Sequence, residues 1–207
     1  ARVAVVALSR PVLRVALVSP RDTAIATLLR RFRGRLFWAE RKDAARWMGR
    51  ARRDRAHALT IRDEIPPAGV VIDTFRSQMS SVIRRAKAAS DRVLVVGQPW
   101  FEKPSYTPEE EALFWNGAIG QAYKGTVTEF FSTRVICALM GQIDSAASEI
   151  AAREGVEYLR LQGHIAPSAE NFIDHFHATP AAAARIGKLV AEQVLLRPLA
   201  SQQDRLN

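Results

Sequence analysis

The feature that most constrains the fold is an amphipathic helix followed at once by a strand without a polar face. Between residues 73 and 90, apolar side chains recur at the spacing of one helical stripe, at Phe75, Met79, Val82, Ile83 and Ala86. The run Val93-Leu94-Val95-Val96 within residues 92–97 is typical of a strand buried on both faces, and Gln98-Pro99 ends it. A helix that leads directly into such a strand predicts a parallel sheet, and hence an α/β fold.

Two further helices are marked by capping residues. Thr107, Pro108 and Glu110 form a helix-start signature, because the threonine hydroxyl can accept a backbone N–H and the glutamate completes a capping box. A long helix is predicted next, capped by Thr128 and ended by Gly155, with an apolar stripe at Phe131, Val135, Leu139, Ile143, Ala147 and Ile150. Helices therefore alternate with strands over the second half of the chain.

The remaining predicted elements are two strands and a closing helix. Residues 156–161 are predicted as the last strand, and residues 181–196 as a helix stopped by Pro198. An earlier strand is predicted at residues 11–19, an apolar run stopped by Ser19-Pro20. Ligands of open α/β sheets bind at the carboxyl ends of the strands, which is where Ser19 would lie.

The best candidates for chemistry, Asp174 and His177, precede the closing helix. Thr179 and Pro180 are predicted as its N-cap and first residue, so the pair would lie on the loop that leads into the helix. Three positions apart on a short loop, a carboxylate can orient an imidazole and stabilise its protonated form. This is the acid–base half of a hydrolytic triad. The alternative is a helix cap beside a surface histidine.

The residues around this pair, FIDHFHATPAAAARIGKLVAEQV, resemble the last conserved block of the SGNH (GDSL-type) hydrolase and esterase family. The resemblance extends in layout over residues 70–196. It implies a three-layer, flavodoxin-like fold with a parallel sheet flanked by helices. It also implies cleavage of an acyl or acetyl ester of a small molecule or carbohydrate, with Asp174 as the orienting acid and His177 as the base. Neither a cofactor nor a metal is expected.

The nucleophile is the part of the triad that the sequence marks least. The chain contains neither a Gly-Asp-Ser triplet nor a Gly-x-Asn-Asp pattern, which supply the nucleophile and an oxyanion donor in that family. Ser19 is the candidate nucleophile, and the alternative is that it only starts a turn before Pro20. Two functions of different classes follow: an ester hydrolase, or a catalytically inactive relative that keeps the fold as a binding or structural protein.

The positive charge is confined to the first third of the chain. The net charge is +9, and residues 1–65 hold 15 arginines and one lysine against six acidic residues, whereas the other 142 hold 14 basic and 15 acidic ones. Arginine clusters interleaved with aromatic residues could bind phosphates and stack bases, or could be solvated helix faces whose aromatics pack inward. A segment rich in arginine and alanine is also what a GC-rich gene read out of frame gives.

Composition excludes several classes. A single cysteine, Cys137, rules out an internal disulfide and a cysteine-rich zinc site. The apolar run between Val3 and Val18 is interrupted by charge and predicts neither a membrane span nor a signal peptide. We therefore expect a soluble, by default cytoplasmic, single domain over residues 1–207, with residues 1–65 as an atypical arginine-rich part. A basic nucleic-acid-binding protein is the third alternative, without sequence specificity.

Overall fold

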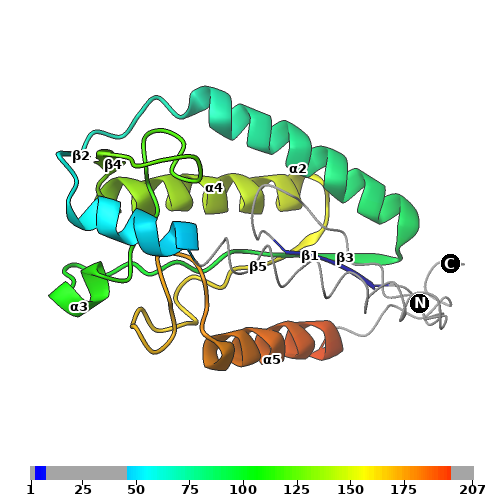
Figure 1. Cartoon of the computed structure of the whole chain (residues 1–207). Coiled ribbons are helices and arrows are strands. Elements are labelled where there is room, and N and C mark those ends of the chain that lie inside the picture. Colours follow the sequence, from blue (N-terminus) through cyan, green and yellow to red (C-terminus); the bar gives the residue numbers. More distant parts are fainter. Residues whose placement is uncertain (1–2, 8–45, 197–207) are drawn as a thin grey trace, which may run out of the picture. The chain divides into compact units, whose positions relative to one another are not determined.

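The computed structural model describes residues 3–7 and 46–196. A helical segment, without a label in Figure 1, covers residues 46–56. The labelled elements are, in chain order, β1 (Val3–Ala7), β2 (Thr60–Arg62), α2 (Gly69–Ala89), β3 (Arg92–Val96), α3 (Pro108–Glu111), β4 (Glu129–Phe131), α4 (Thr133–Arg153), β5 (Glu157–Leu159) and α5 (Pro180–Leu196). Helices and strands alternate, and the α/β class expected from the sequence is confirmed.

The described residues divide into two compact units. Unit 1 comprises residues 3–7, 65–104 and 137–196, and unit 2 comprises residues 46–64 and 105–136. Each unit contains its own sheet, β1-β3-β5 in unit 1 and β2-β4 in unit 2. The assignment of all 207 residues to a single domain stays a prediction.

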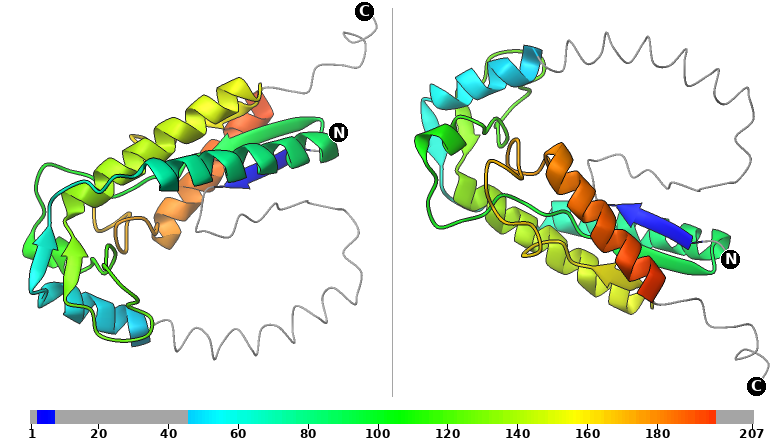
Figure 2. Two further views of the ribbon diagram at one scale, coloured as in Figure 1. Left: turned by 90° about the horizontal axis from the view of Figure 1, so that it is seen from above. Right: turned by 90° about the horizontal axis from the view of Figure 1, so that it is seen from below.

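The sheet of unit 1 is parallel, as the helix–strand succession predicted. β3 pairs with β1 on one side and with β5 on the other, in registers that place Val96 opposite both Ala7 and Leu159. Helices α2 and α4 lie on one face of this sheet and α5 lies on the other (Figure 1). In Figure 2, α2 lies in front of the strands in the view from above and α5 in the view from below.

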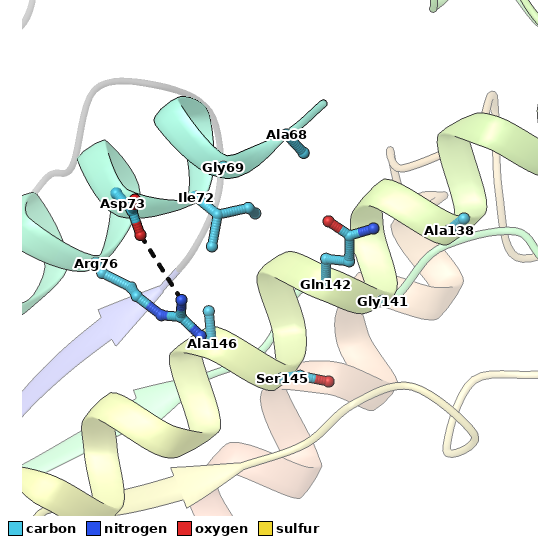
Figure 3. A pocket seen from close by; sticks show the side chains of 10 residues that line it. All are labelled: Ala68, Gly69, Ile72, Asp73, Arg76, Ala138, Gly141, Gln142, Ser145 and Ala146. Carbon is cyan, nitrogen blue, oxygen red and sulfur yellow. Dashed lines mark ion pairs between the residues drawn. The ribbon is translucent and has the colours of Figure 1, made fainter. Parts of the chain in front are cut away.

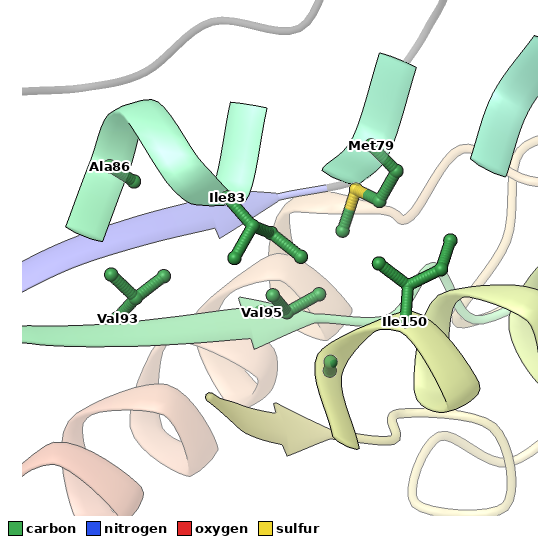
Figure 4. Close-up of a cluster of buried hydrophobic side chains, with 7 residues drawn as sticks. Met79, Ile83, Ala86, Val93, Val95 and Ile150 are labelled. Carbon is green, nitrogen blue, oxygen red and sulfur yellow. The ribbon is translucent and has the colours of Figure 1, made fainter. Parts of the chain in front are cut away.

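β3 supplies buried side chains to both faces, which explains its apolar run from Val93 to Val96. On one face, Val93 and Val95 join a buried cluster with α2 and α4, made of Met79, Ile83, Ala86, Ile150 and Ala151 (Figure 4). On the other face, Leu94 and Val96 pack with Leu161 against residues of α5, including Ile186, Leu189 and Val190. All four residues from Val93 to Val96 are buried, which favours apolar side chains at every one of these positions.

The start of α4 differs from its prediction. Thr128 does not cap this helix, because residues 129–131 form β4 and pair with β2. Ser132 is the cap instead, and its hydroxyl accepts the Val135 N–H at 3.2 Å. The end of the helix is as predicted: Gly155 has a φ of 66°, a left-handed conformation that glycine adopts without strain.

Two other predicted starts are confirmed. Thr107 caps α3 with both bonds of the capping box, although this helix ends at Glu111, before the aromatic residues that follow it. Thr179 caps α5 by accepting the Ala182 N–H at 3.3 Å, and Pro180 is the first helical residue.

The first described strand lies ahead of the predicted one in the chain. β1 covers Val3–Ala7, whereas the predicted strand at residues 11–19, with Ser19 at its end, lies outside the described residues. The sequence signal for β1 is the run Val3-Ala4-Val5-Val6, which is hard to separate from the longer apolar stretch that follows it.

In unit 2, arginines of the helical segment 46–56 bind backbone carbonyl groups of the chain between residues 113 and 131. Arg50 donates to Ala122 O at 2.9 Å, and Arg52 donates to Leu113 O at 3.0 Å. Arg55 donates to Asn116 O at 2.8 Å and to Phe131 O at 2.9 Å. These three arginines therefore organise a loop of their own unit.

One aromatic residue of the arginine-rich part, Trp47, packs against another ring of unit 2. Trp115 is buried, and its ring meets that of Trp47 edge to face at 4.8 Å.

Among the described helices, α4 is long and apolar enough to cross a membrane by length and composition. Its residues Ile150 and Ala151 belong to the cluster with β3, which is the setting of a core helix.

Candidate active site

Asp174 and His177 form a close, well-defined pair in unit 1. Asp174 Oδ2 lies 2.6 Å from His177 Nδ1. The carboxylate is 1% exposed, whereas the imidazole side chain is 35% exposed. The pair therefore has a buried acid and a base that reaches the surface, which is the order that a hydrolytic triad requires.

The loop between residues 171 and 179 is closed by its own backbone. Phe172 and Ala178 form an antiparallel bridge, Ile173 N–H donates to His177 O at 2.9 Å, and Thr179 N–H donates to Asn171 O at 2.9 Å. At the tip, Asp174 Oδ1 accepts the N–H groups of Phe176 and His177, each at 2.9 Å. This local bonding brings the side chains of Asp174 and His177 side by side.

The segment after β3 holds this loop at the carboxyl end of the sheet. Phe101 N–H donates to His175 O at 2.8 Å, and the Phe101 ring stacks on Phe172 at 5.5 Å. Gln98 Nε2 donates to Phe176 O at 2.8 Å. Because β3 is the central strand of the described sheet, these contacts tie the acid–base pair to the edge where ligands bind in α/β proteins.

The electrostatics of Asp174 favour its ionised form. Burial acts to raise the pKa of this carboxyl, but the hydrogen bonds from His177 and from the two backbone N–H groups outweigh burial, and the pKa lies below its ordinary value. An ionised Asp174 accepts the proton on His177 Nδ1 and so selects the tautomer with its lone pair on Nε2. That tautomer is the form that can act as a base on the side of the ring away from Asp174.

A second acid is buried beside the same strand end. Asp144 of α4 is 5% exposed, binds the Tyr158 hydroxyl through Oδ1, and forms an ion pair with Arg160 Nε at 3.1 Å. Burial, and then the hydrogen bond to Asp144, raise the pKa of Tyr158. The cluster packs against Gly97, where an added Cβ would lie 2.6 Å from the Tyr158 hydroxyl. It fixes the backbone immediately before Gln98.

The predicted site residues divide into two groups. Asp174 and His177 come together as expected, whereas Ser19 lies outside the described residues. Gln98 and the Asp144 cluster were missed, because their partners are far away in the sequence. The one sequence signal for Gln98 was a polar residue directly after an apolar strand.

A groove of unit 1 lies between the start of α2 and the middle of α4 (Figure 3). It has a volume of about 600 Å³, and its lining includes Ile72, Asp73, Arg76, Gly141, Gln142 and Ser145. An ion pair of 3.8 Å joins Asp73 and Arg76 on its α2 side. No histidine lines it in the described part of the chain, so Ser145 has no neighbouring base there.

The chain matches no protein-family model, no curated protein and no solved structure.

Proposed function

We propose that the chain is an SGNH-type ester hydrolase in which Asp174 and His177 are the acid and base of a Ser-His-Asp triad. One observation carries the proposal: a buried carboxylate, held by two backbone N–H groups, lies 2.6 Å from the Nδ1 of a partly exposed imidazole. A surface histidine beside a helix cap needs none of these features. The substrate class is an acyl or acetyl ester of a small molecule or carbohydrate.

In the proposed reaction, His177 Nε2 takes the proton of a serine hydroxyl while the serine oxygen attacks the ester carbonyl carbon. Asp174 holds the imidazole and stabilises its positive charge. The imidazolium then gives its proton to the leaving alcohol as the C–O bond breaks, which leaves an acyl-enzyme. Water enters by the same steps in reverse, with His177 again as the base, and the acid is released.

The architecture of unit 1 supports the same proposal at the level of the fold. A parallel sheet with α2 and α4 on one face and α5 on the other is what a three-layer, flavodoxin-like arrangement requires. The acid–base loop follows the last strand and precedes the last helix, and it is bound to the carboxyl end of β3. Both are positions that the proposed family would use.

The second candidate is a catalytically inactive relative that keeps the fold as a binding or structural protein. The sequence observation that favours it is the lack of a Gly-Asp-Ser triplet anywhere in the 207 residues. Residues 1–65 contain two serines, Ser9 and Ser19, and neither has the flanking residues of that motif. Without a nucleophile, the base would have no hydroxyl to activate.

A fluorophosphonate probe separates the two candidates, because it reports an activated serine wherever that serine lies in the chain. In a serine hydrolase, the activated serine oxygen displaces fluoride from phosphorus and stays phosphonylated, so peptide mass spectrometry locates it. We expect labelling of one serine in the native chain, and loss of that label after heat denaturation and in His177→Ala. Labelling of Ser19 would support its assignment, and labelling of Ser9 would move the nucleophile to the serine just after β1. Equal labelling of native and denatured chain would reject the hydrolase.

A further inference from the structure

We propose that Gln98 is the positioning residue of the site, because it fixes the peptide group to which His177 is attached. The expected effect on kcat rests on the proposed function. The hydrogen bonds that hold the peptide group do not depend on it. The Phe176–His177 peptide group is held at both ends. Its carbonyl oxygen accepts from Gln98 Nε2 at 2.8 Å, and its N–H donates to Asp174 Oδ1 at 2.9 Å.

The orientation of the Gln98 amide follows from its neighbours. Nε2 donates to Phe176 O at 2.8 Å and to Pro99 O at 3.0 Å, so both protons of the amide nitrogen meet carbonyl oxygens. A flipped amide would turn its own oxygen toward these two acceptors, which is repulsive. Gln98 therefore acts as a donor, and a donor is what the Phe176 carbonyl requires.

The position of Gln98 is itself fixed by the strand that precedes it. Gly97 N–H donates to Leu159 O at 2.8 Å, which continues the β3–β5 ladder by one bond. A Cβ added to Gly97 would lie 2.6 Å from the Tyr158 hydroxyl and 3.0 Å from Asp144 Oδ1, so there is no room for a side chain at this position. The Gln98 amide therefore links the carboxyl end of β3 to the 171–179 loop, through a hydrogen bond between residues 78 apart in the sequence.

Loss of the amide would free one end of the peptide group next to the base. The Asp174 carboxylate would still hold the N–H, but the group could rotate about that bond and carry the imidazole away from Oδ2. Misplacement of a reacting group by about 1 Å can cost about 100-fold in rate, so we expect kcat for an aryl ester to fall by about 10- to 100-fold at unchanged KM.

The test compares Gln98→Leu and Gln98→Glu with Gln162→Leu. Gln162 is the matched control: its Oε1 accepts the Trp100 N–H at 2.9 Å, so it anchors the same segment after β3 through the backbone of Trp100. Two-dimensional ¹H–¹⁵N spectra of the imidazole give the tautomer of His177. We expect an Nδ1-protonated ring in the parent and in Gln162→Leu, and a mixture of tautomers in both Gln98 variants.

The two readouts separate this inference from the proposed function. A parent without esterase activity would reject the hydrolase, and the tautomer of His177 would still decide the role of Gln98. Retention of the Nδ1-protonated ring in folded Gln98→Leu would overturn the positioning role. An equal fall in kcat for Gln98→Leu and Gln162→Leu would overturn it as well, since any disturbance of the segment would then suffice.

Discussion

The hydroxyl of Tyr158 occupies the space into which a side chain on Gly97 would project. A Cβ at residue 97 would lie 2.6 Å from the Tyr158 oxygen and 3.0 Å from Asp144 Oδ1. Close packing of Tyr158 and Asp144 against the carboxyl end of β3 therefore requires a glycine at residue 97. The buried acid cluster and the strand end are packed as one piece.

We expect Gly97→Ala to destabilise the fold by about 1–3 kcal/mol, the usual cost of forcing extra atoms into a filled interior. Chemical denaturation measures the free energy of unfolding. Adding Tyr158→Phe should recover part of the loss, because the nearest atom is then absent, and a double-mutant cycle would show this coupling.

The control is Gly141→Ala in α4, where an added Cβ meets no atom within 4 Å. There we expect no loss, or a gain of up to about 1 kcal/mol from helix propensity. Equal losses at positions 97 and 141 would contradict the steric explanation.

For the base, we expect His177→Ala to lower kcat on a short-chain aryl ester by about 10²- to 10⁴-fold, the range of general acid–base catalysis. Circular dichroism should show a folded chain, because the substitution is confined to a surface loop. The exposed His164, on the turn after β5, is the matched control, and His164→Ala should keep full activity. Equal activity of the His177 variant and the parent would remove His177 from the mechanism.

For the acid, stability should depend on pH through Asp174. Because its pKa is lowered in the folded chain, the unfolded chain binds the proton first, and the contribution of this carboxylate is lost as the pH falls below about 4. In Asp174→Asn, the free energy of unfolding should therefore decline less steeply below that pH.

The exposed Glu170, next to the same loop, provides the comparison variant. Glu170→Gln should keep the pH slope of the parent. If the unfolding free energy of Asp174→Asn declined with falling pH as steeply as that of the parent, other carboxyl groups would control stability at acid pH.

For unit 2, we expect Arg55→Met to cost about 2–3 kcal/mol in unfolding free energy, since it removes a charged donor from two carbonyl groups. The guanidinium also lies over the Phe130 ring, at 5.6 Å from its centre. Arg53, which is exposed on the same helical segment, gives the control, and Arg53→Met should change stability by less than about 0.5 kcal/mol. Equal effects would mean that charge, not hydrogen bonding, accounts for the loss.

The sequence predicted those features whose causes are local. The Asp174–His177 contact spans three residues and the capping box of Thr107 spans three, so both can be read from spacing. β3 was predictable because burial on both faces leaves a continuous apolar run.

Features that depend on distant partners were not predictable. Thr128 is a good N-cap by residue type, but the pairing of residues 129–131 with β2 extends the strand past it, and Ser132 caps the helix instead. The arginines of the helical segment 46–56 suggested a basic surface, because nothing in the sequence indicated that loop carbonyl groups would accept hydrogen bonds from them. Gln98 was missed for the same reason.

The hydrogen bonds within the 171–179 loop have a consequence for the order of folding. Those that assemble the acid–base pair join residues two to three apart, so they require almost no loop-closure entropy. The bond from Gln98 joins residues 78 apart and can form only when the sheet edge exists. Asp174 and His177 can therefore come together before the sheet is complete, whereas the Phe176–His177 peptide group is fixed to the sheet edge only after the sheet has formed.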